Sequence, residues 1–161
     1  MEIRLAQKQD IPGILSLLAQ VGQVHAQGRP DIFRADALKY NEDNLEVLLQ
    51  DDSRPILVAA EGENVLGYAF CVRKAVKNDS VLADNEELYV DDLCVDEGLR
   101  GKGIGSRLYE AVLALAKELG VSRVTLNVWA FNTSALKFYE KCGMKPQRIF
   151  METNLEENHA E

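Results

Sequence analysis

Apolar residues recur every three or four positions in several parts of the chain, which is the spacing of one buried face of an α-helix. The clearest series predicts a helix over residues 104–119. Its members are Ile104, Leu108, Val112, Leu115 and Leu119. The same spacing predicts helices over residues 10–21 and 41–49. A fourth helix, over residues 132–143, starts at an asparagine and ends at a glycine, which are typical helix-end residues.

Short apolar or alternating runs predict the strands. Residues 56–60 are wholly apolar, and 65–72 follow after a turn that contains glycine and asparagine, so the two segments are predicted to form a hairpin. The remaining predicted strands are 2–6, 86–95, 123–128, and one strand or a bent pair within 146–155. Residues 74–85 are polar and without period, as in an exposed loop. Because helices and strands are interleaved, we expect an α/β domain with a mixed sheet.

Composition and charge limit the classes of function. With 161 residues, of which 47% are hydrophobic and 27% charged, the chain suits a single domain at 1–155 with a polar tail at 156–161. No apolar run could cross a membrane and the start lacks a signal-peptide core, so we expect a cytoplasmic protein without a membrane partner. The net charge of −8 argues against nucleic acid as a partner. It suits a cationic acceptor through electrostatic steering, or serves solubility alone.

Three cysteines, Cys71, Cys94 and Cys142, are odd in number and lack metal-ligand spacing. We therefore expect free thiols, with neither a disulfide framework nor a metal site.

A glycine-rich loop from Arg100 to Ser106, just before the 104–119 helix, is the strongest candidate for chemistry. Glycines let the backbone turn with its N–H groups exposed, and a helix start adds unpaired N–H donors and the positive end of its dipole. The junction therefore predicts an anion site suited to phosphate. Its spacing is neither that of the phosphate-binding loop, which needs Gly-Lys-Ser/Thr, nor that of the dinucleotide fingerprint, which needs a third glycine further on.

The order Arg100-x-x-Gly103-x-Gly105, after a strand that ends in Leu93-Cys94-Val95, resembles the acetyl-CoA loop of the GCN5-related N-acetyltransferase (GNAT) family. Residues 132–144 resemble that family's later motif, and residues 88–144 carry the specific part of the resemblance. It implies a single-domain GNAT-like fold. In that fold a mixed sheet of about six to seven strands, with two central strands that splay apart, is flanked by about four helices.

The resemblance also implies acetyl-CoA as cofactor, with no metal. The glycine loop would cradle the pyrophosphate, the main chain at the strand end would bond the pantetheine amides, and the asparagine of the later motif would contact the cofactor arm. The expected cofactor-binding residues are Leu93, Cys94, Val95, Arg100, Gly101, Lys102, Gly103, Ile104, Gly105, Ser106, Asn132, Ala135 and Tyr139.

Catalytic candidates follow from the same resemblance. Tyr139 falls at the family's tyrosine position and is the expected general acid for the leaving thiolate, unless it only packs among aromatics. Asp91 and Asp92 resemble the acidic strand of polyamine and aminoglycoside acetyltransferases, where they would bind the cationic amine or accept its proton through water. Side chains alternate along a strand, so both face the acceptor only if a bulge intervenes; we favour Asp91. A backbone N–H of Cys94 or Val95 is the expected oxyanion donor, whereas the Cys94 thiol is not expected to be a nucleophile.

The segment 24–33 breaks the helical pattern, and in the resembling family the equivalent segment lies over the acceptor pocket. His25, Arg29, Asp31 and Phe33 are therefore candidate acceptor contacts, or else surface and core residues without such a role.

The predicted function is acetyl transfer from acetyl-CoA to a primary amine, in a small cation of the polyamine or aminoglycoside type. The alternatives are a protein N-terminal or lysine acetyltransferase and, in another class, a non-catalytic CoA-binding regulatory module. A homodimer is also expected from the resemblance and from the strand-rich C-terminal end, which could pair or swap edges.

Overall fold

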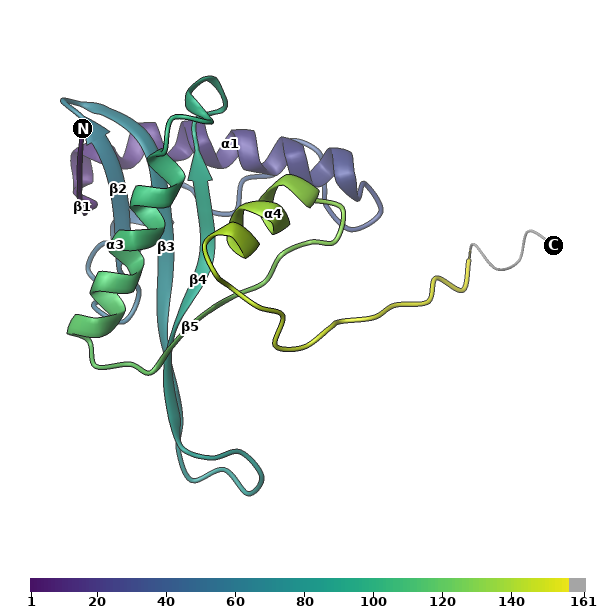
Figure 1. The fold of residues 1–161 in the computed structure, drawn as a ribbon. Helices are drawn as coiled ribbons and strands as arrows, with labels where there is room; N and C mark the ends of the chain where they lie inside the picture. The colour runs from purple at the N-terminus through teal and green to yellow at the C-terminus, as the bar shows by residue number, and fades with distance from the viewer. Residues whose placement is uncertain (157–161) are drawn as a thin grey trace.

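A five-stranded mixed sheet lies at the centre of the protein in the computed structural model, which describes residues 1–156 (Figure 1). Its strands are β1 (Glu2–Leu5), β2 (Ile56–Glu61), β3 (Asn64–Val76), β4 (Asn85–Val95) and β5 (Arg123–Leu126), in that spatial order. Neighbouring strands are antiparallel except β4 and β5, which are parallel. The predicted α/β class with a mixed sheet is confirmed, but the described chain has five strands rather than six to seven.

Four helices flank this sheet, as predicted: α1 (Ile11–Gly28), α2 (Glu42–Leu48), α3 (Ile104–Glu118) and α4 (Thr133–Lys141), with short 3₁₀ turns at Lys8–Asp10 and Glu97–Leu99. One hydrophobic core packs α1 and α2 on one face of the sheet, and a second packs α3 on the other face. No helix of the described residues is long and apolar enough to span a bilayer.

The two cores explain why the sequence of β2 does not alternate between apolar and polar residues. Ile56 and Val58 point to the α1 face, whereas Leu57 and Ala59 point to the α3 face. A strand that is buried on both faces is apolar throughout.

Two predictions of local structure were wrong. The segment 74–85 is not all loop, because β3 and β4 pair as far as Val76 and Asn85 and form a long hairpin. Residues 146–155 form no strand; the chain after α4 leads away from the body (Figure 1). A strand is defined by backbone pairing, and this segment has no partner within the described residues. The predicted tail at 156–161 lies, apart from Glu156, outside the described residues.

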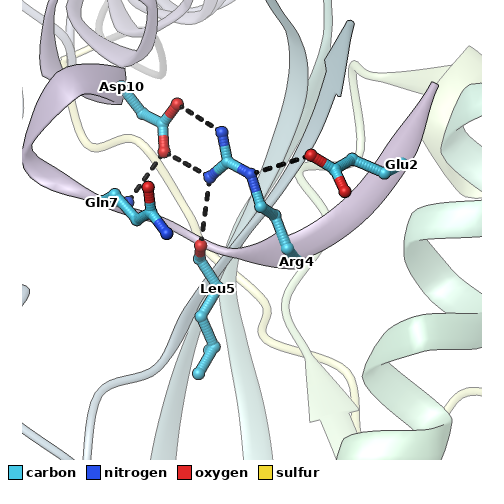
Figure 2. A network of polar contacts seen from close by, with 5 residues as sticks. All are labelled: Glu2, Arg4, Leu5, Gln7 and Asp10. Carbon is cyan, nitrogen blue, oxygen red and sulfur yellow. Dashed lines mark hydrogen bonds and ion pairs between the residues drawn. The ribbon is translucent and has the colours of Figure 1, made fainter. Parts of the chain in front are cut away.

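A buried ion pair fastens β1 to the start of α1 (Figure 2). The guanidinium of Arg4 donates to both carboxylate oxygens of Asp10, at 2.7 and 3.0 Å, and the backbone N–H of Gln7 donates to Asp10 at 2.7 Å. Asp10 is only 1% exposed. Burial alone would raise its pKa, but these hydrogen bonds and the Arg4 charge hold the pKa below the ordinary aspartate value. The carboxylate is therefore buried in its charged form with its hydrogen-bond partners in place.

Candidate active site

A β-bulge in β4 decides which way its two aspartates point. Phe70 of β3 pairs with Asp92 and Cys71 pairs with Val90, so Asp91 is an extra residue without a partner. Such an insertion reverses the alternation of side chains along a strand. Val90 packs in the core on the α3 side, whereas Cys94, two residues beyond Asp92, packs on the α1 side. The bulge therefore turns Asp91 and Asp92 toward the same face, the α1 face.

The carboxylate of Asp91 holds an ammonium group of the protein itself. The Nζ atom of Lys39 lies 2.7 Å from Asp91 Oδ2, and the Tyr40 hydroxyl donates to the same oxygen at 3.2 Å. Burial would lower the pKa of Lys39, but the Asp91 carboxylate outweighs it and holds this pKa above the ordinary lysine value. Burial and Asp91 together raise the pKa of Tyr40. Asp91 thus binds a charged primary amine at the edge of the α1 face.

Asp92 lies deeper, beside two tyrosines. The hydroxyl of the fully buried Tyr68 donates to Asp92 Oδ2 at 2.6 Å. Burial raises the pKa of Asp92 despite this bond. It also raises the pKa of Tyr68, to which the charge of Asp92 adds. Asp92 is therefore suited to hold or pass on a proton, because its charged form is less favourable than that of an exposed aspartate.

The second half of β4 has a free edge. The pairing of β5 with β4 stops at Val90, opposite Leu126, one residue before the bulge, and β4 continues to Val95 without a neighbour on that side among the described residues. Figure 1 shows the chain after β5 turning away from β4 toward α4. The predicted cofactor contacts Leu93, Cys94 and Val95 lie on this stretch. An unpaired strand edge offers backbone donors and acceptors to an extended ligand.

The thiol of Cys94 is directed into the core beneath this edge, where burial and then Asp92 raise its pKa to about 12. A thiol in such surroundings stays protonated and is a poor nucleophile.

The glycine-rich loop brings the start of α3 to the same end of β4. Gly101 and Gly103 have φ angles of 80° and 81°, in the left-handed region that favours glycine, and Gly103 precedes the first helical residue. The side chains of Arg100 and Lys102 are exposed and form no ion pair within residues 1–156. Free N–H groups at the start of α3 and two unpaired cations fit a pyrophosphate.

Helix α4 contacts the start of α3. Its packing against α3 is tight, since a Cβ at Gly105 would lie 3.3 Å from the ring of Phe138. The side chain of Asn132 caps the helix by accepting from the Ala135 N–H at 3.3 Å. The predicted cofactor contacts of α3 lie next to the end of β4, since a Cβ at Gly105 would be 3.7 Å from the Val95 side chain; they are Ile104, Gly105 and Ser106. The predicted contacts Asn132 and Ala135 lie at the start of α4.

Tyr139, on the second turn of α4, lies near the deeper carboxylate. Burial and then the charge of Asp92 raise its pKa above the ordinary tyrosine value. Its hydroxyl forms no hydrogen bond with any described residue, and the nearest aromatic neighbours are Phe138 and Tyr109, at 5.1 and 6.5 Å between ring centroids. A phenol that stays protonated and has an unused O–H is suited to proton donation.

An aromatic cluster adjoins Lys39 at the end of α1. His25 stacks on Phe33 at 4.7 Å between centroids, Phe33 meets Trp129 edge-on at 4.9 Å, and Phe131 lies 6.3 Å from His25. Burial and then Lys39 lower the pKa of His25, which keeps the imidazole neutral. The predicted acceptor contacts His25 and Phe33 are thus brought together.

The other two acceptor candidates are engaged elsewhere. Arg29 donates to both oxygens of Asp31, at 2.9 and 2.8 Å, and also pairs with Glu152. The charges and hydrogen-bonding groups of Arg29 and Asp31 are therefore paired with each other and with Glu152.

Sequence reasoning missed five residues that contact these predicted side chains: Lys39, Tyr40, Tyr68, Trp129 and Phe131. Tyr68 could have been found, because it lies two residues from Phe70 and therefore on the same face of a predicted strand. The others lie in irregular segments, where no periodicity indicates a direction.

The described residues contain no group of three or more His, Cys, Asp or Glu side chains arranged to hold a metal ion.

Comparison with known proteins agrees with this geometry. An uncharacterized N-acetyltransferase of Mycobacterium tuberculosis is 33% identical over 97 residues, which are 60% of this chain and 56% of that protein. The chain thus matches little more than half the length of this relative. The L-ornithine N5-acetyltransferase NATA1 of Arabidopsis thaliana is 39% identical over 67 residues, 42% of this chain and 28% of that protein.

Solved structures share the whole fold. A mutant of the BH1408 protein from Bacillus halodurans is 33% identical and superposes with a TM-score of 0.92 over 96% of this chain and 99% of that chain. The aminoglycoside N-acetyltransferase AAC(6')-Iy, solved in complex with CoA, shares the fold at 16% identity, with a TM-score of 0.70 over 95% of this chain and 98% of that chain. Residues 22–144 match the sequence model of the acetyltransferase (GNAT) family, and the chain belongs to that family.

Proposed function

We propose that residues 1–155 form one acetyltransferase domain that transfers an acetyl group from acetyl-CoA directly to the primary amine of a small cationic acceptor. The observation that carries this proposal is the free edge of β4. It begins at the bulge that turns Asp91 and Asp92 to one face, and it lies between the glycine loop and Tyr139. Family membership and the CoA complex of a protein with the same fold support the choice of cofactor.

Each part of the site has a role in this proposal. Acetyl-CoA supplies the acetyl group as a thioester. Arg100, Lys102 and the N–H groups at the start of α3 hold its pyrophosphate, and the edge of β4 pairs with its extended arm. A backbone N–H of Cys94 or Val95 stabilises the developing oxyanion, a contribution of roughly 3–4 kcal/mol where such a donor is preorganised.

Two protons must move. The acceptor amine attacks only when neutral, so Asp91 binds the ammonium form and its proton leaves to the carboxylates, directly or through water. Tyr139 donates its phenolic proton to the departing thiolate. Its raised pKa keeps the phenol protonated but also makes it a weaker acid, so the proton moves only as negative charge develops on the sulfur.

Lys39 supports a cationic acceptor. Its ammonium occupies Asp91 at 2.7 Å, in the position where the ammonium of a substrate would bind. The aromatic rings of Phe33 and Trp129 nearby suit the alkyl part or the charge of such a substrate. The Arabidopsis relative is named for ornithine, which also carries a primary amine on a short chain.

The test is thiol release from acetyl-CoA with polyamines, aminoglycosides, amino acids and short peptides as acceptors. We expect turnover with a small cation, and a loss of about 10²-fold or more in kcat for Tyr139→Phe, within the usual range of general acid–base catalysis. Tyr109→Phe is the matched control: it removes a hydroxyl from the neighbouring ring and should leave kcat unchanged. Equal rates for the wild type and Tyr139→Phe would exclude Tyr139 as the acid.

The same panel separates the alternatives. Turnover with peptides alone would favour a protein acetyltransferase. The Asp91 carboxylate would suit such an acceptor too, because it already binds the ammonium group of a lysine side chain, that of Lys39. If acetyl-CoA raises the melting temperature but no acceptor is turned over, the CoA-binding regulatory module is favoured.

A further inference from the structure

Lys39 is a primary amine that the protein holds in its own candidate acceptor position. Its Nζ atom lies 2.7 Å from Asp91 Oδ2, on the carboxylate that would bind the ammonium of an acceptor. Burial would lower the pKa of Lys39, but the Asp91 carboxylate and the charge of Asp92 raise it. Both acids of the site therefore act on the ammonium of Lys39.

The other lysines that pair with carboxylates lie away from this site. Lys8 pairs with Glu46 of α2 at 3.3 Å, and Lys77, just after β3, pairs with Glu86 at 3.6 Å. Both side chains are more exposed than that of Lys39. Among the lysine–carboxylate pairs within residues 1–156, Lys39 alone is paired with an acid of the candidate site.

The segment that carries Lys39 leaves the amine room to move. Residues 34–40 form no backbone–backbone hydrogen bond within the described part of the chain. The Lys39 side chain is 45% exposed, and a lysine stem is a flexible chain of four carbons. The amine is thus held by its ion pair rather than by a rigid element, beside the residue at which the free edge of β4 begins.

We propose that the protein acetylates its own Lys39 when no external acceptor is bound, and that this modification frees Asp91. The inference rests on the proposed function, because it uses the same acetyl-CoA and the same acids.

The reaction follows the course proposed for an external amine. The ammonium of Lys39 gives one proton to the carboxylates, directly or through water, and the neutral Nζ forms a bond to the acetyl carbon. The carbon–sulfur bond breaks, and the departing thiolate takes the phenolic proton of Tyr139. The nitrogen then loses a second proton, which restores the phenol through water. The products are an amide on Lys39, the free thiol of CoA and one proton.

Acetylation changes what Lys39 can hold. The product is a neutral amide, which cannot form an ion pair with Asp91. The Tyr40 hydroxyl, at 3.2 Å, remains as a hydrogen-bond donor to that carboxylate. The modified protein therefore offers Asp91 to the ammonium of the next acceptor, so that self-acetylation activates the site.

The first test is incubation of the full chain with acetyl-CoA in the absence of an acceptor, followed by intact mass measurement and peptide mapping. We expect the mass of one added acetyl group, located on Lys39, while Lys8 and Lys77 react only at the background rate of chemical acetylation. The rate per molecule should not depend on protein concentration, because amine and site belong to one molecule. A rate that rises with protein concentration would show transfer between molecules and would overturn the proposal.

Variants assign the modification to the site. Tyr139→Phe should acetylate Lys39 about 10²-fold more slowly. Lys39→Arg should gain no acetyl group, because a guanidinium stays charged. Lys77→Arg is the matched control, since it keeps a cation beside Glu86 and should leave the acetylation of Lys39 unchanged. Equal labelling of Lys39 and Lys77 in the wild type would refute self-acetylation.

The second test compares KM before and after this incubation, once CoA has been removed by gel filtration. The acetylated wild type should have a KM for a cationic acceptor about fivefold lower, whereas the same incubation should leave the KM of Lys39→Met unchanged. An unchanged KM in the acetylated wild type would overturn the release of Asp91.

The outcomes separate this inference from the function on which it rests. Turnover of an external acceptor by protein that stays unmodified at Lys39 would overturn self-acetylation and leave the proposed function intact. Acetylation of neither Lys39 nor any external acceptor would refute both.

Discussion

Replacing Arg4 by methionine isolates the buried ion pair between β1 and α1. Methionine keeps most of the side-chain volume but leaves the carboxylate of Asp10, which is 1% exposed, with the Gln7 N–H as its remaining partner. Breaking a fully buried pair costs about 3–5 kcal/mol. Because the Arg4 side chain is 20% exposed and the Gln7 bond survives, we expect the lower end, about 3 kcal/mol. For a domain of this size that is a fall in melting temperature of roughly 6–12 °C.

The pH dependence gives this prediction a second readout. The pKa of Asp10 is lowered in the folded protein, so the wild-type stabilisation is complete above the unfolded value of 3.8 and is lost as pH falls through the lower folded value. In Arg4→Met the hydrogen bonds and charge of Arg4 no longer lower the pKa of Asp10, the Gln7 bond alone remains, and burial favours the neutral acid. The difference in melting temperature between the two proteins should therefore narrow as pH falls toward 4 and below.

The assay is thermal unfolding by circular dichroism across this pH range, with Arg73→Met as control. Arg73 contacts Glu86 at 2.8 Å, nearly the distance of the Arg4–Asp10 pair, but both side chains are about one-third exposed. Such surface pairs contribute about 0–1 kcal/mol. If Arg4→Met lost no more stability than Arg73→Met, or if its deficit did not shrink in acid, the reasoning from burial would be wrong.

Two further predictions concern the site. Lys39→Met frees Asp91 and should lower KM for a cationic acceptor about fivefold, the equivalent of ~1 kcal/mol for a half-exposed pair. The control Lys8→Met breaks the exposed pair with Glu46 and should leave KM unchanged. A rise in KM for Lys39→Met would mean that Lys39 helps to bind substrate. Burial raises the pKa of the Cys94 thiol to about 12, so Cys94 should be spared when native protein is treated with iodoacetamide at mildly alkaline pH, whereas Cys142 should be alkylated. Peptide mapping measures this difference, and rapid labelling of Cys94 would contradict its burial.

The parts of the fold that periodicity encodes could be predicted from the sequence. The apolar run of β2 indicates a strand that is buried on both faces, and the helical series of α3 indicates a helix that is buried on one face; the structure shows both. The left-handed angles at Gly101 and Gly103 follow from residue type in the same way. The grouping of Lys39 with Asp91 depends on the path of an irregular loop, which no local pattern specifies.

The C-terminal segment shows the limit of local propensity. Ile149, Phe150 and Met151 favour a strand, but whether a strand forms depends on a partner that lies elsewhere in space. The bulge at Asp91 is a similar case. Sequence reasoning could state that both aspartates would share a face only with an insertion, but the insertion depends on the register against β3.

That single inserted residue makes the length of β4 as important as its composition. Without Asp91, Val90 and Asp92 would be consecutive and would keep their partners Cys71 and Phe70, so Asp92 would still point to the α1 face beside Tyr68. The α1 face would then carry one carboxylate instead of two, because the group that binds Lys39 would be lost. When related sequences are compared, a one-residue gap in this strand therefore marks a site that keeps the proton-holding group but lacks the second acid.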